Sequence, residues 1–218
     1  MPKIVSLQVG LPAQRSYGND ADGQDKVWRS AIFKAPVTSA VRLGKENFEG
    51  DRQADLENHG GPDKAVLMYA ESNYAYWRKV LPQRAWVYGG FGENLTVTEM
   101  TEDKVALGDI YSIGSVRVEV SQPRIPCWKL ARRWQQKDLA ARVEQNGFGG
   151  WYVRVLEVGT VIVGQKLKLL ERPYPEWTIS RVFDITYNLD RNVEESLALA
   201  HCPAYASKMR DQILQKFG

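Results

Sequence analysis

The chain has 218 residues, of which 44% are hydrophobic and 25% are charged, a balance that is ordinary for a water-soluble globular protein. Its net charge of +3, from 29 basic and 26 acidic residues, is too small to argue for nucleic-acid binding. The two cysteines show no zinc-type spacing, the first residues lack the apolar run of a signal peptide, and no stretch is apolar enough to span a membrane. We therefore expect a cytoplasmic protein with reduced thiols, no membrane association and no nucleic-acid partner.

Short strands dominate the first 170 residues. Alternating or continuous apolar patterns predict strands at 3–9, 37–43, 64–70, 95–98, 110–113, 115–121, 151–157, 159–163 and 165–170. Helical spacing predicts helices at 71–80, 128–135 and 137–145. The polar segments 11–30 and 45–63 are predicted to be long loops. Many short strands separated by glycine and proline, with few helices, indicate a closed or strongly curved β-barrel.

The composition changes after residue 172, where a proline-containing linker leads into a helical tail. Helices are predicted at 178–187, 192–201 and 204–217, with Asn192 as the N-cap of the second. The expected fold is therefore mainly β with added α: a β-barrel domain at 1–171 followed by a small three-helix C-terminal domain at 172–218. A unit of this size is too small to be stable alone, so we expect it to pack on the barrel.

Cys127 occupies a transition from strand to helix. The strand pattern of 115–121 is followed by Pro123 and Pro126, which we expect to end strand pairing, and helical spacing begins immediately after the cysteine. Free amide N–H groups at a helix start and the nearby charges of Arg124 and Lys129 favour a thiolate. A thiolate attacks electrophiles or binds soft metals. The structural alternative is a buried, inert cysteine that fills space.

Two loops carry polar groups that suit a binding site. The segment 51–64 places acids, amides and His59 around two glycines, which would let the backbone approach a ligand closely. The glycines of 89–94 would form a nest of N–H groups that binds an anion, and Asn94 would offer its amide to a ligand. Each loop alone is also typical of a turn whose polar groups satisfy one another. A cysteine–histidine hydrolase would need His59 beside Cys127, which the sequence leaves open.

Taken together, these segments resemble the MOSC family, the domain found at the C-terminal end of molybdenum-cofactor sulfurases and in the mitochondrial amidoxime reducing component. The resembling residues are Asp55, 58–66, 90–96, 108–109 and 122–130. Their order and spacing both fit, and the resemblance covers about residues 30–170. The helical tail is similar to the three-helix extension of the YiiM-like bacterial branch of the family.

The resemblance implies a MOSC-type β-barrel in which the thiolate of Cys127 ligates molybdenum. It implies that a pterin-based molybdenum cofactor (molybdopterin) lies in a cleft between the loops around 52–64, 89–94 and 122–127. The residues expected to bind this cofactor are Gln53, Asp55, His59, Lys64, Gly92, Asn94 and Arg124, with His59 joining Cys127 as a candidate catalytic residue. Lys64, Arg124 and the N–H groups of Gly90–Gly92 would supply the anion site that the cofactor's phosphate needs.

The resemblance also implies an activity. Members related to the amidoxime reducing component reduce N-hydroxylated substrates, and the YiiM-like branch is associated with resistance to N-hydroxylated base analogues. We therefore expect a molybdenum-dependent reductase of hydroxylaminopurines, amidoximes and hydroxylamines. The chain lacks the thiols of an iron–sulfur cluster and any visible flavin or nicotinamide motif, so a separate electron-donating reductase is expected. The alternative is a non-catalytic carrier of the cofactor, or of sulfane sulfur, on Cys127. The tail would shape the cleft, bind the reductase or form a homodimer.

Overall fold

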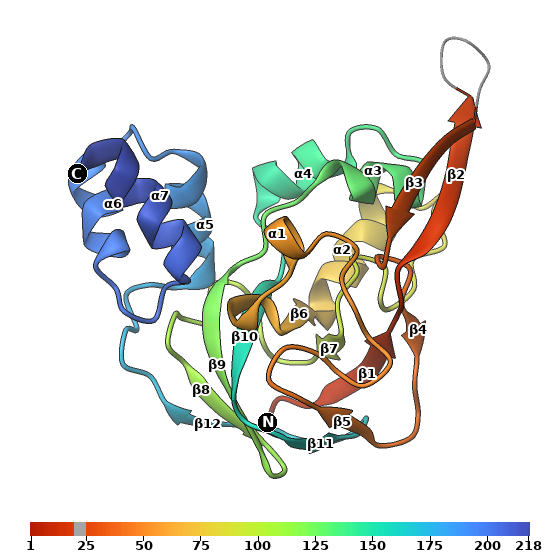
Figure 1. Cartoon of the computed structure of the whole chain (residues 1–218), viewed down its shortest axis with the longest axis horizontal. Helices are drawn as coiled ribbons and strands as arrows, with labels where there is room; N and C mark the ends of the chain where they lie inside the picture. Colours follow the sequence, from red (N-terminus) through yellow and green to blue (C-terminus); the bar gives the residue numbers. More distant parts are fainter. Residues whose placement is uncertain (20–24) are drawn as a thin grey trace.

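The structure, a computed structural model, describes residues 1–19 and 25–218. Its centre is an eight-stranded sheet that curls into a half-barrel, with most of the helices gathered at one end of it (Figure 1). In spatial order the strands are β12 (Leu167–Glu171), β8 (Ile110–Ile113), β9 (Val116–Pro123), β10 (Trp151–Glu157), β6 (Val66–Ala70), β7 (Leu95–Val97), β1 (Ile4–Val9) and β4 (Ala35–Pro36). All neighbours are antiparallel except β6 and β7. The expected mainly β, barrel-like fold with added helices is confirmed.

The two sides of the curled sheet meet at the start of β1. Lys3 forms an isolated bridge with Lys166, just before the edge strand β12. The N–H of Leu167 donates to the carbonyl of Pro2 at 2.9 Å, and the N–H of Ile4 donates to the carbonyl of Gln165 at 3.0 Å. These bonds use backbone groups that an open sheet edge would leave unpaired. The inward-facing apolar side chains of the strands form one continuous core behind this closure.

A two-stranded hairpin projects from the body of the molecule (Figure 1). Strand β2 (Ala13–Asn19) pairs antiparallel with β3 (Asp25–Ser30). The prediction of a loop at 11–30 was therefore wrong for both strands, and residues 20–24 lie outside the described part of the chain. The hairpin stands away from the sheet, and Val27 is 62% exposed. Near its base the hairpin is half-buried, since Trp28 belongs to the aromatic core and Ser30 is buried, but this alternation covers only residues 27–30, too few to mark the whole segment as strand.

Three further predictions need correction. The strand expected at 37–43 is shorter: β5 (Val41–Leu43) pairs with β11 (Gly159–Val161) in a separate two-stranded sheet. The loop expected at 45–63 contains α1 (Leu56–His59) and runs into the 3₁₀ helix η1 (Pro62–Lys64). Pro123 does not end strand pairing, since it lies opposite Trp151 and the next N–H, of Arg124, donates to Gly150 at 2.9 Å. A proline removes one donor, and its neighbours here continue the ladder.

Helices cover one end of the sheet. The helix predicted at 71–80 is confirmed as α2 (Glu71–Val80), and α3 (Trp128–Trp134) and α4 (Leu139–Asn146) match the next two predictions closely. Together with the segment that follows α2, they enclose a second core rich in aromatic rings. Within it, Trp86 stacks on Phe91 with ring centroids 5.5 Å apart. This second core supports the backbone of the 89–94 loop.

The C-terminal tail contains α5 (Ile179–Tyr187), α6 (Val193–Ala200) and α7 (Ser207–Phe217). As expected, Asn192 caps α6, accepting a hydrogen bond from the N–H of Glu195 at 3.1 Å. The tail packs on the half-barrel, because its apolar side chains belong to the same core as those of β9. The boundary at residues 171–172 stays a prediction, since one core extends across it.

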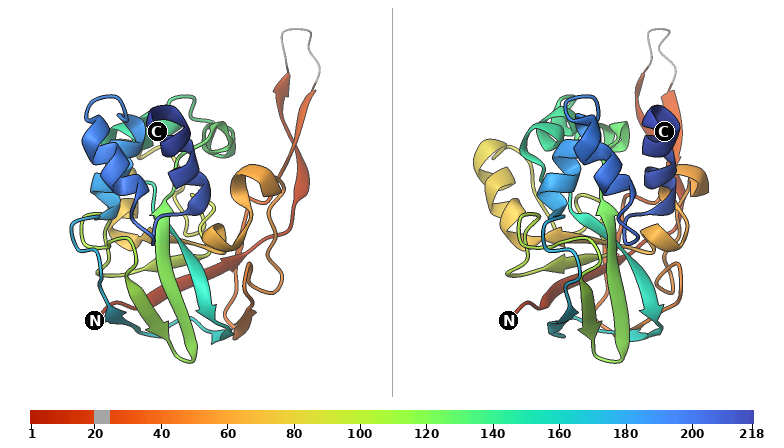
Figure 2. Two further views of the ribbon diagram at one scale, coloured as in Figure 1. Left: turned by 60° about the vertical axis from the view of Figure 1, so that its left-hand side comes forward. Right: turned by 90° about the vertical axis from the view of Figure 1, so that its left-hand side faces the viewer.

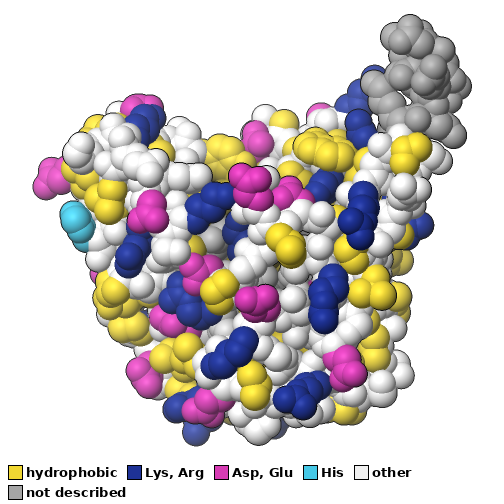
Figure 3. Space-filling model, in the orientation of Figure 1, with side chains coloured by type: hydrophobic (Ala, Val, Ile, Leu, Met, Phe, Trp, Pro, Cys, Tyr) yellow, Lys and Arg dark blue, Asp and Glu magenta, His cyan; other side chains and the backbone are white. Residues whose placement is uncertain are grey.

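The described helices include none with both the length and the apolar character needed to cross a membrane. On the face shown in Figure 3, basic and acidic side chains are interspersed, without the continuous basic stripe that nucleic-acid-binding surfaces present.

Candidate functional site

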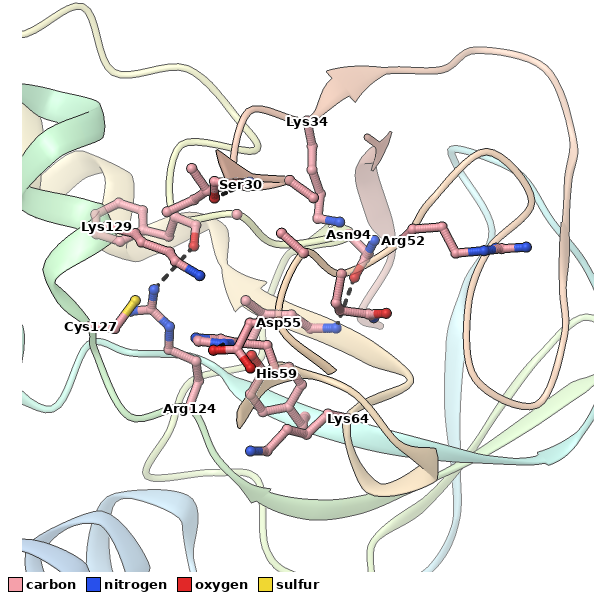
Figure 4. A pocket seen from close by; sticks show the side chains of 18 residues that line it. Ser30, Lys34, Arg52, Asp55, His59, Lys64, Asn94, Arg124, Cys127 and Lys129 are labelled. Atoms are coloured by element: carbon pink, nitrogen blue, oxygen red, sulfur yellow. Dashed lines mark hydrogen bonds and ion pairs between the residues drawn. The ribbon is translucent and has the colours of Figure 1, made fainter. Parts of the chain in front are cut away.

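A pocket opens where the loops singled out in the sequence converge (Figure 4). It holds about 600 Å³ of empty space when the open solvent at its mouth is counted. The structure brings every predicted site residue to its lining: Gln53, Asp55, His59, Lys64, Gly92, Asn94, Arg124 and Cys127. Lys129, expected near Cys127, and Arg52 of the 52–64 loop also line it, and so do residues that sequence reasoning missed, among them Ser30, Lys34 and Tyr152.

Cys127 sits at the pocket wall as the N-cap of α3. Burial disfavours the charged thiolate, but a hydrogen bond from the His59 side chain, the positive charge of Arg124 and the backbone N–H of Lys129 outweigh that effect. Together these groups lower the pKa of Cys127 to about 7. The other thiol behaves oppositely, because burial raises the pKa of Cys202. Cys127 is therefore the thiol of this chain that is substantially ionised near neutral pH.

His59 reaches Cys127 from the short helix α1. The helix begins at its N-cap Asp55, whose carboxylate accepts the backbone N–H of Asn58 at 3.0 Å. That bond, together with the Asn58 side chain, lowers the pKa of Asp55 to about 2. His59 is one turn further on, and its Nδ1 lies 3.4 Å from Asp55 Oδ2, an electrostatic contact too long for a good hydrogen bond. Carboxylate, imidazole and thiol thus follow one another along the pocket wall.

Cations line the other sides of the pocket. Arg124 is 5% exposed, and its Nη1 has no hydrogen-bond partner among residues 1–19 and 25–218, while Nη2 is 3.5 Å from the carbonyl of Phe91. Lys64 donates to the carbonyl of Asn58 at 2.6 Å, and burial is the largest cause that lowers its pKa. A buried guanidinium nitrogen without a partner is rare in native proteins and indicates room for a ligand atom. The charge of these groups favours an anionic ligand.

The glycine loop does not form the anion nest that we predicted. Its N–H groups already have partners inside the protein, because the side chain of Glu93 is fully buried beneath them. The carboxylate accepts from Gly89 N at 2.6 Å and from Phe91 N at 3.0 Å, while Gly92 N donates to the carbonyl of Gly89 at 2.9 Å. Gly92 still lines the pocket, with a φ of +81° and with Ile32 so close that an added Cβ would lie 2.9 Å from its Cγ1. Because Gly92 has no side chain, it lets the backbone pack closely at the pocket wall, but it offers no free N–H to a ligand.

The side chain of Asn94 also makes its hydrogen bonds within the protein, and not with a ligand as predicted. Its Oδ1 accepts from Leu67 N at 3.1 Å, and its Nδ2 donates to Asp51 Oδ2 at 2.9 Å. Asp51 is fully buried and pairs with the ammonium group of Lys34, which lines the pocket. Sequence reasoning missed this pair, because an ion pair between residues 17 positions apart leaves no local pattern. The sequence analysis included Asp51 in the polar segment 51–64, but it gave no sign of the partner Lys34.

Comparison with known proteins agrees with this architecture. A Bacillus subtilis protein, YflK, is 40% identical over 213 residues, covering 98% of this chain and 93% of its own. A protein of Gibberella moniliformis named as a reductase is 39% identical over 176 residues, which cover 79% of this chain but only 31% of the relative. The crystal structure of YiiM from Geobacillus stearothermophilus superposes with a TM-score of 0.82 at 33% identity, with all of both chains covered.

The family model for the MOSC domain matches residues 55–168, a segment that runs from the N-cap of α1 to β12 and contains His59, Lys64, Asn94, Arg124 and Cys127. This match supports a function associated with the molybdenum cofactor, and the relative named as a reductase adds support for oxidoreductase activity. Fold, pocket and sequence agree, and the chain belongs to the MOSC domain family.

Proposed function

We propose that this protein is a molybdenum-cofactor-dependent reductase of N-hydroxylated compounds such as hydroxylaminopurines, amidoximes and hydroxylamines, with Cys127 as the protein ligand of the metal. The observation that carries the proposal is a thiol with a pKa of about 7 in the wall of a pocket lined by cations. A soft thiolate suits a high-valent molybdenum centre. The described residues contain no group of three or more His, Cys, Asp or Glu that would hold a bare ion, so a metal that brings its other ligands with it fits best.

The residues present fit such a cofactor. Among the described residues Arg124 Nη1 has no partner, so it offers a donor for a phosphate together with the ammonium group of Lys64 in the same pocket. Lys34 adds a further ammonium group, whose charge is balanced by Asp51. When bound, the cofactor supplies the two-electron chemistry that the protein itself lacks.

His59 has two tasks in this proposal. Its hydrogen bond keeps Cys127 ionised, which prepares the thiolate to bind the metal. Reduction of an N–OH group to N–H consumes two electrons and two protons and releases water. His59 lies in the pocket wall between a carboxylate and the thiolate, where an imidazole holds a proton close to the reacting group. Asp55 orients α1 through its cap.

The electrons are proposed to come from a separate reductase. The fungal relative named as a reductase supports this view, because the part that matches this chain is only 31% of its length. In the proposed arrangement, this chain contributes the pocket and the thiolate, and another protein contributes the redox groups.

A second candidate function is a non-catalytic carrier of the cofactor, or of sulfane sulfur, on Cys127. The same ionised thiol favours it, since a thiolate accepts sulfur as readily as it binds a metal. In that case the protein would bind or transfer its cargo without turning over an N-hydroxylated substrate.

The molybdenum content of wild-type protein and of Cys127→Ala, after identical anaerobic loading with cofactor, tests the first step. We expect close to one metal per wild-type chain and much less in the variant. Equal loading would remove Cys127 as the ligand. Loaded wild-type protein supplied with a chemical electron donor should then reduce a hydroxylamine through many turnovers, whereas a carrier would show a persulfide mass shift or cofactor transfer without turnover.

A further inference from the structure

The loop that carries His59 is held by the C-terminal helices as well as by the sheet, and Asp63 is where these parts meet. Its Oδ1 accepts a hydrogen bond from Arg154 Nε of β10 at 2.8 Å. Its Oδ2 accepts the backbone N–H of Ser207, the first residue of α7, at 3.1 Å. Its carbonyl accepts from Ser121 Oγ of β9 at 2.6 Å. One residue therefore joins the pocket loop to two strands and to the tail.

Two further contacts join the same parts. Arg154 Nη2 donates to the carbonyl of Ala204, in the segment that leads into α7, at 3.0 Å. Lys208, in the first turn of α7, donates to the carbonyl of Glu57 in α1 at 3.0 Å. The right-hand view of Figure 2 shows the start of α7, in dark blue, close to the orange segment that contains α1 and η1. The tail therefore touches the loop at both α1 and Asp63.

The loop depends on such anchors because it has little packing of its own. Helix α1 contains four residues, and none of them is buried. A helix this short is unstable in isolation. The anchors at Asp63 are better protected, since the Asp63 and Arg154 side chains are 25% and 20% exposed, and a partly buried ion pair is screened less than one at the surface. The position of His59 therefore depends on the cap at Asp55, on the attachment of Asp63 and on the bonds that Lys64 and Lys208 donate to carbonyl groups of α1.

We infer that the C-terminal three-helix unit positions the 55–64 loop over the pocket, with Asp63 as the positioning residue that acts on His59 through α1. This inference goes beyond the proposed function, because it concerns where His59 lies relative to Cys127 whatever the pocket binds. It also assigns the C-terminal helices a structural role that their sequence alone does not predict. The test needs neither cofactor nor substrate.

Ser207→Pro is the sharpest perturbation, because it removes the N–H that Asp63 accepts and leaves every side chain of the loop in place. Proline is well tolerated at the first position of a helix. The preceding residue, Ala206, has φ −52° and ψ 132°, the extended conformation that a residue before proline adopts. Ser207→Ala keeps the N–H and is the matched control. Glu195→Gln breaks the ion pair with Arg181 elsewhere in the tail and is a second control.

Two measurements on the cofactor-free protein report the position of His59. The chain has two histidines, so the ring-proton NMR signals of His201 serve as an internal reference for those of His59. Amide hydrogen exchange follows the N–H groups of His59 and Gly60, which donate to Asp55 and Leu56. In Ser207→Pro we expect exchange at both amides to increase about tenfold, as for the loss of one hydrogen bond to a charged group. The His59 ring signals should shift while those of His201 stay, and both controls should resemble wild type.

Wild-type exchange rates and wild-type His59 signals in a folded Ser207→Pro protein would overturn the inference. Asp63→Asn provides a second route, because it removes the charge that Arg154 and Ser207 share. It should produce the same two changes, to a larger extent. If Ser207→Pro does not fold, the same measurements on Asp63→Asn decide the question, and unchanged values there would refute the positioning role.

Discussion

Replacing His59 by Gln tests the electrostatics of the pocket without reference to any cofactor. In the wild-type protein Cys127 has a pKa of about 7, so about half of it is thiolate at pH 7. The side-chain hydrogen bond from His59 is the largest of the causes that lower this pKa, and the burial that opposes it remains in the variant. We therefore expect the pKa to return at least to the ordinary value of about 8.5. The thiolate fraction at pH 7 would then be about 3%.

The rate of alkylation by iodoacetamide measures this change, and mass spectrometry separates Cys127 from the buried Cys202. The thiolate fraction at pH 7 falls about fifteenfold, but a thiolate of higher pKa is about fivefold more nucleophilic for a rise of 1.5 units. The net slowing at pH 7 is thus only about threefold. The informative quantity is the midpoint of the pH–rate profile, which should move from about 7 to about 8.5 or above.

The matched control is His201→Gln, because His201 is exposed at the end of α6 and is not among the groups that shift the Cys127 pKa. Its profile should coincide with that of wild type. A midpoint that stays near 7 in His59→Gln would refute the reasoning and leave Arg124 and the start of α3 as the source of the thiolate.

Three other substitutions test separate parts of the site. Glu93→Gln should lower the free energy of unfolding by about 2–3 kcal/mol in urea denaturation, since the charged acceptor of the glycine loop is lost; a change under about 0.5 kcal/mol, which is normal for a neutral surface site, would contradict its role. Arg124→Gln should weaken phosphate binding, measured by calorimetry, about tenfold with little loss of stability, because Nη1 has no partner in the described part of the chain; unchanged binding would place the anion elsewhere. The pKa of Asp55 is lowered in the fold, so the stability it contributes is complete above about pH 4 and is lost as the pH falls toward about 2. In Asp55→Asn the free energy of unfolding should therefore fall less between about pH 4 and about pH 2 than in wild type. The same fall in both proteins would argue against the cap.

The sequence predicted those features that depend on local periodicity or on the family motifs. The helix at 71–80 begins and ends where its spacing indicated, because its apolar side faces the aromatic core and its other side faces water. Cys127 lies between strand and helix, as the change of period around it indicated. The convergence of the three loops was available only through the resemblance, since residues far apart in sequence carry no mutual signal.

The failures have physical reasons of their own. In the β2–β3 hairpin the alternation of exposed and buried residues is confined to 27–30, which is too short a pattern to predict two strands. The predicted anion nest was already filled, because a glycine loop cannot be distinguished by pattern from one that surrounds an internal carboxylate such as Glu93. The Lys34–Asp51 pair and the attachment of Asp63 to α7 join distant segments, and only the folded chain shows them.

The hairpin also has a consequence for how this fold can diversify. Near its base, Trp28 belongs to the aromatic core and its ring centroid lies 5.4 Å from that of Trp128, next to Cys127. The chain then continues into Ser30 and Ile32 of the pocket wall, where Arg133 donates to the carbonyl of Ile32. Substitutions on the exposed side of this base, as at Val27, therefore cost the fold little stability, whereas substitutions at Trp28 disturb the packing beside the pocket. One short strand thus carries side chains that are free to vary next to side chains that are tied to the pocket wall.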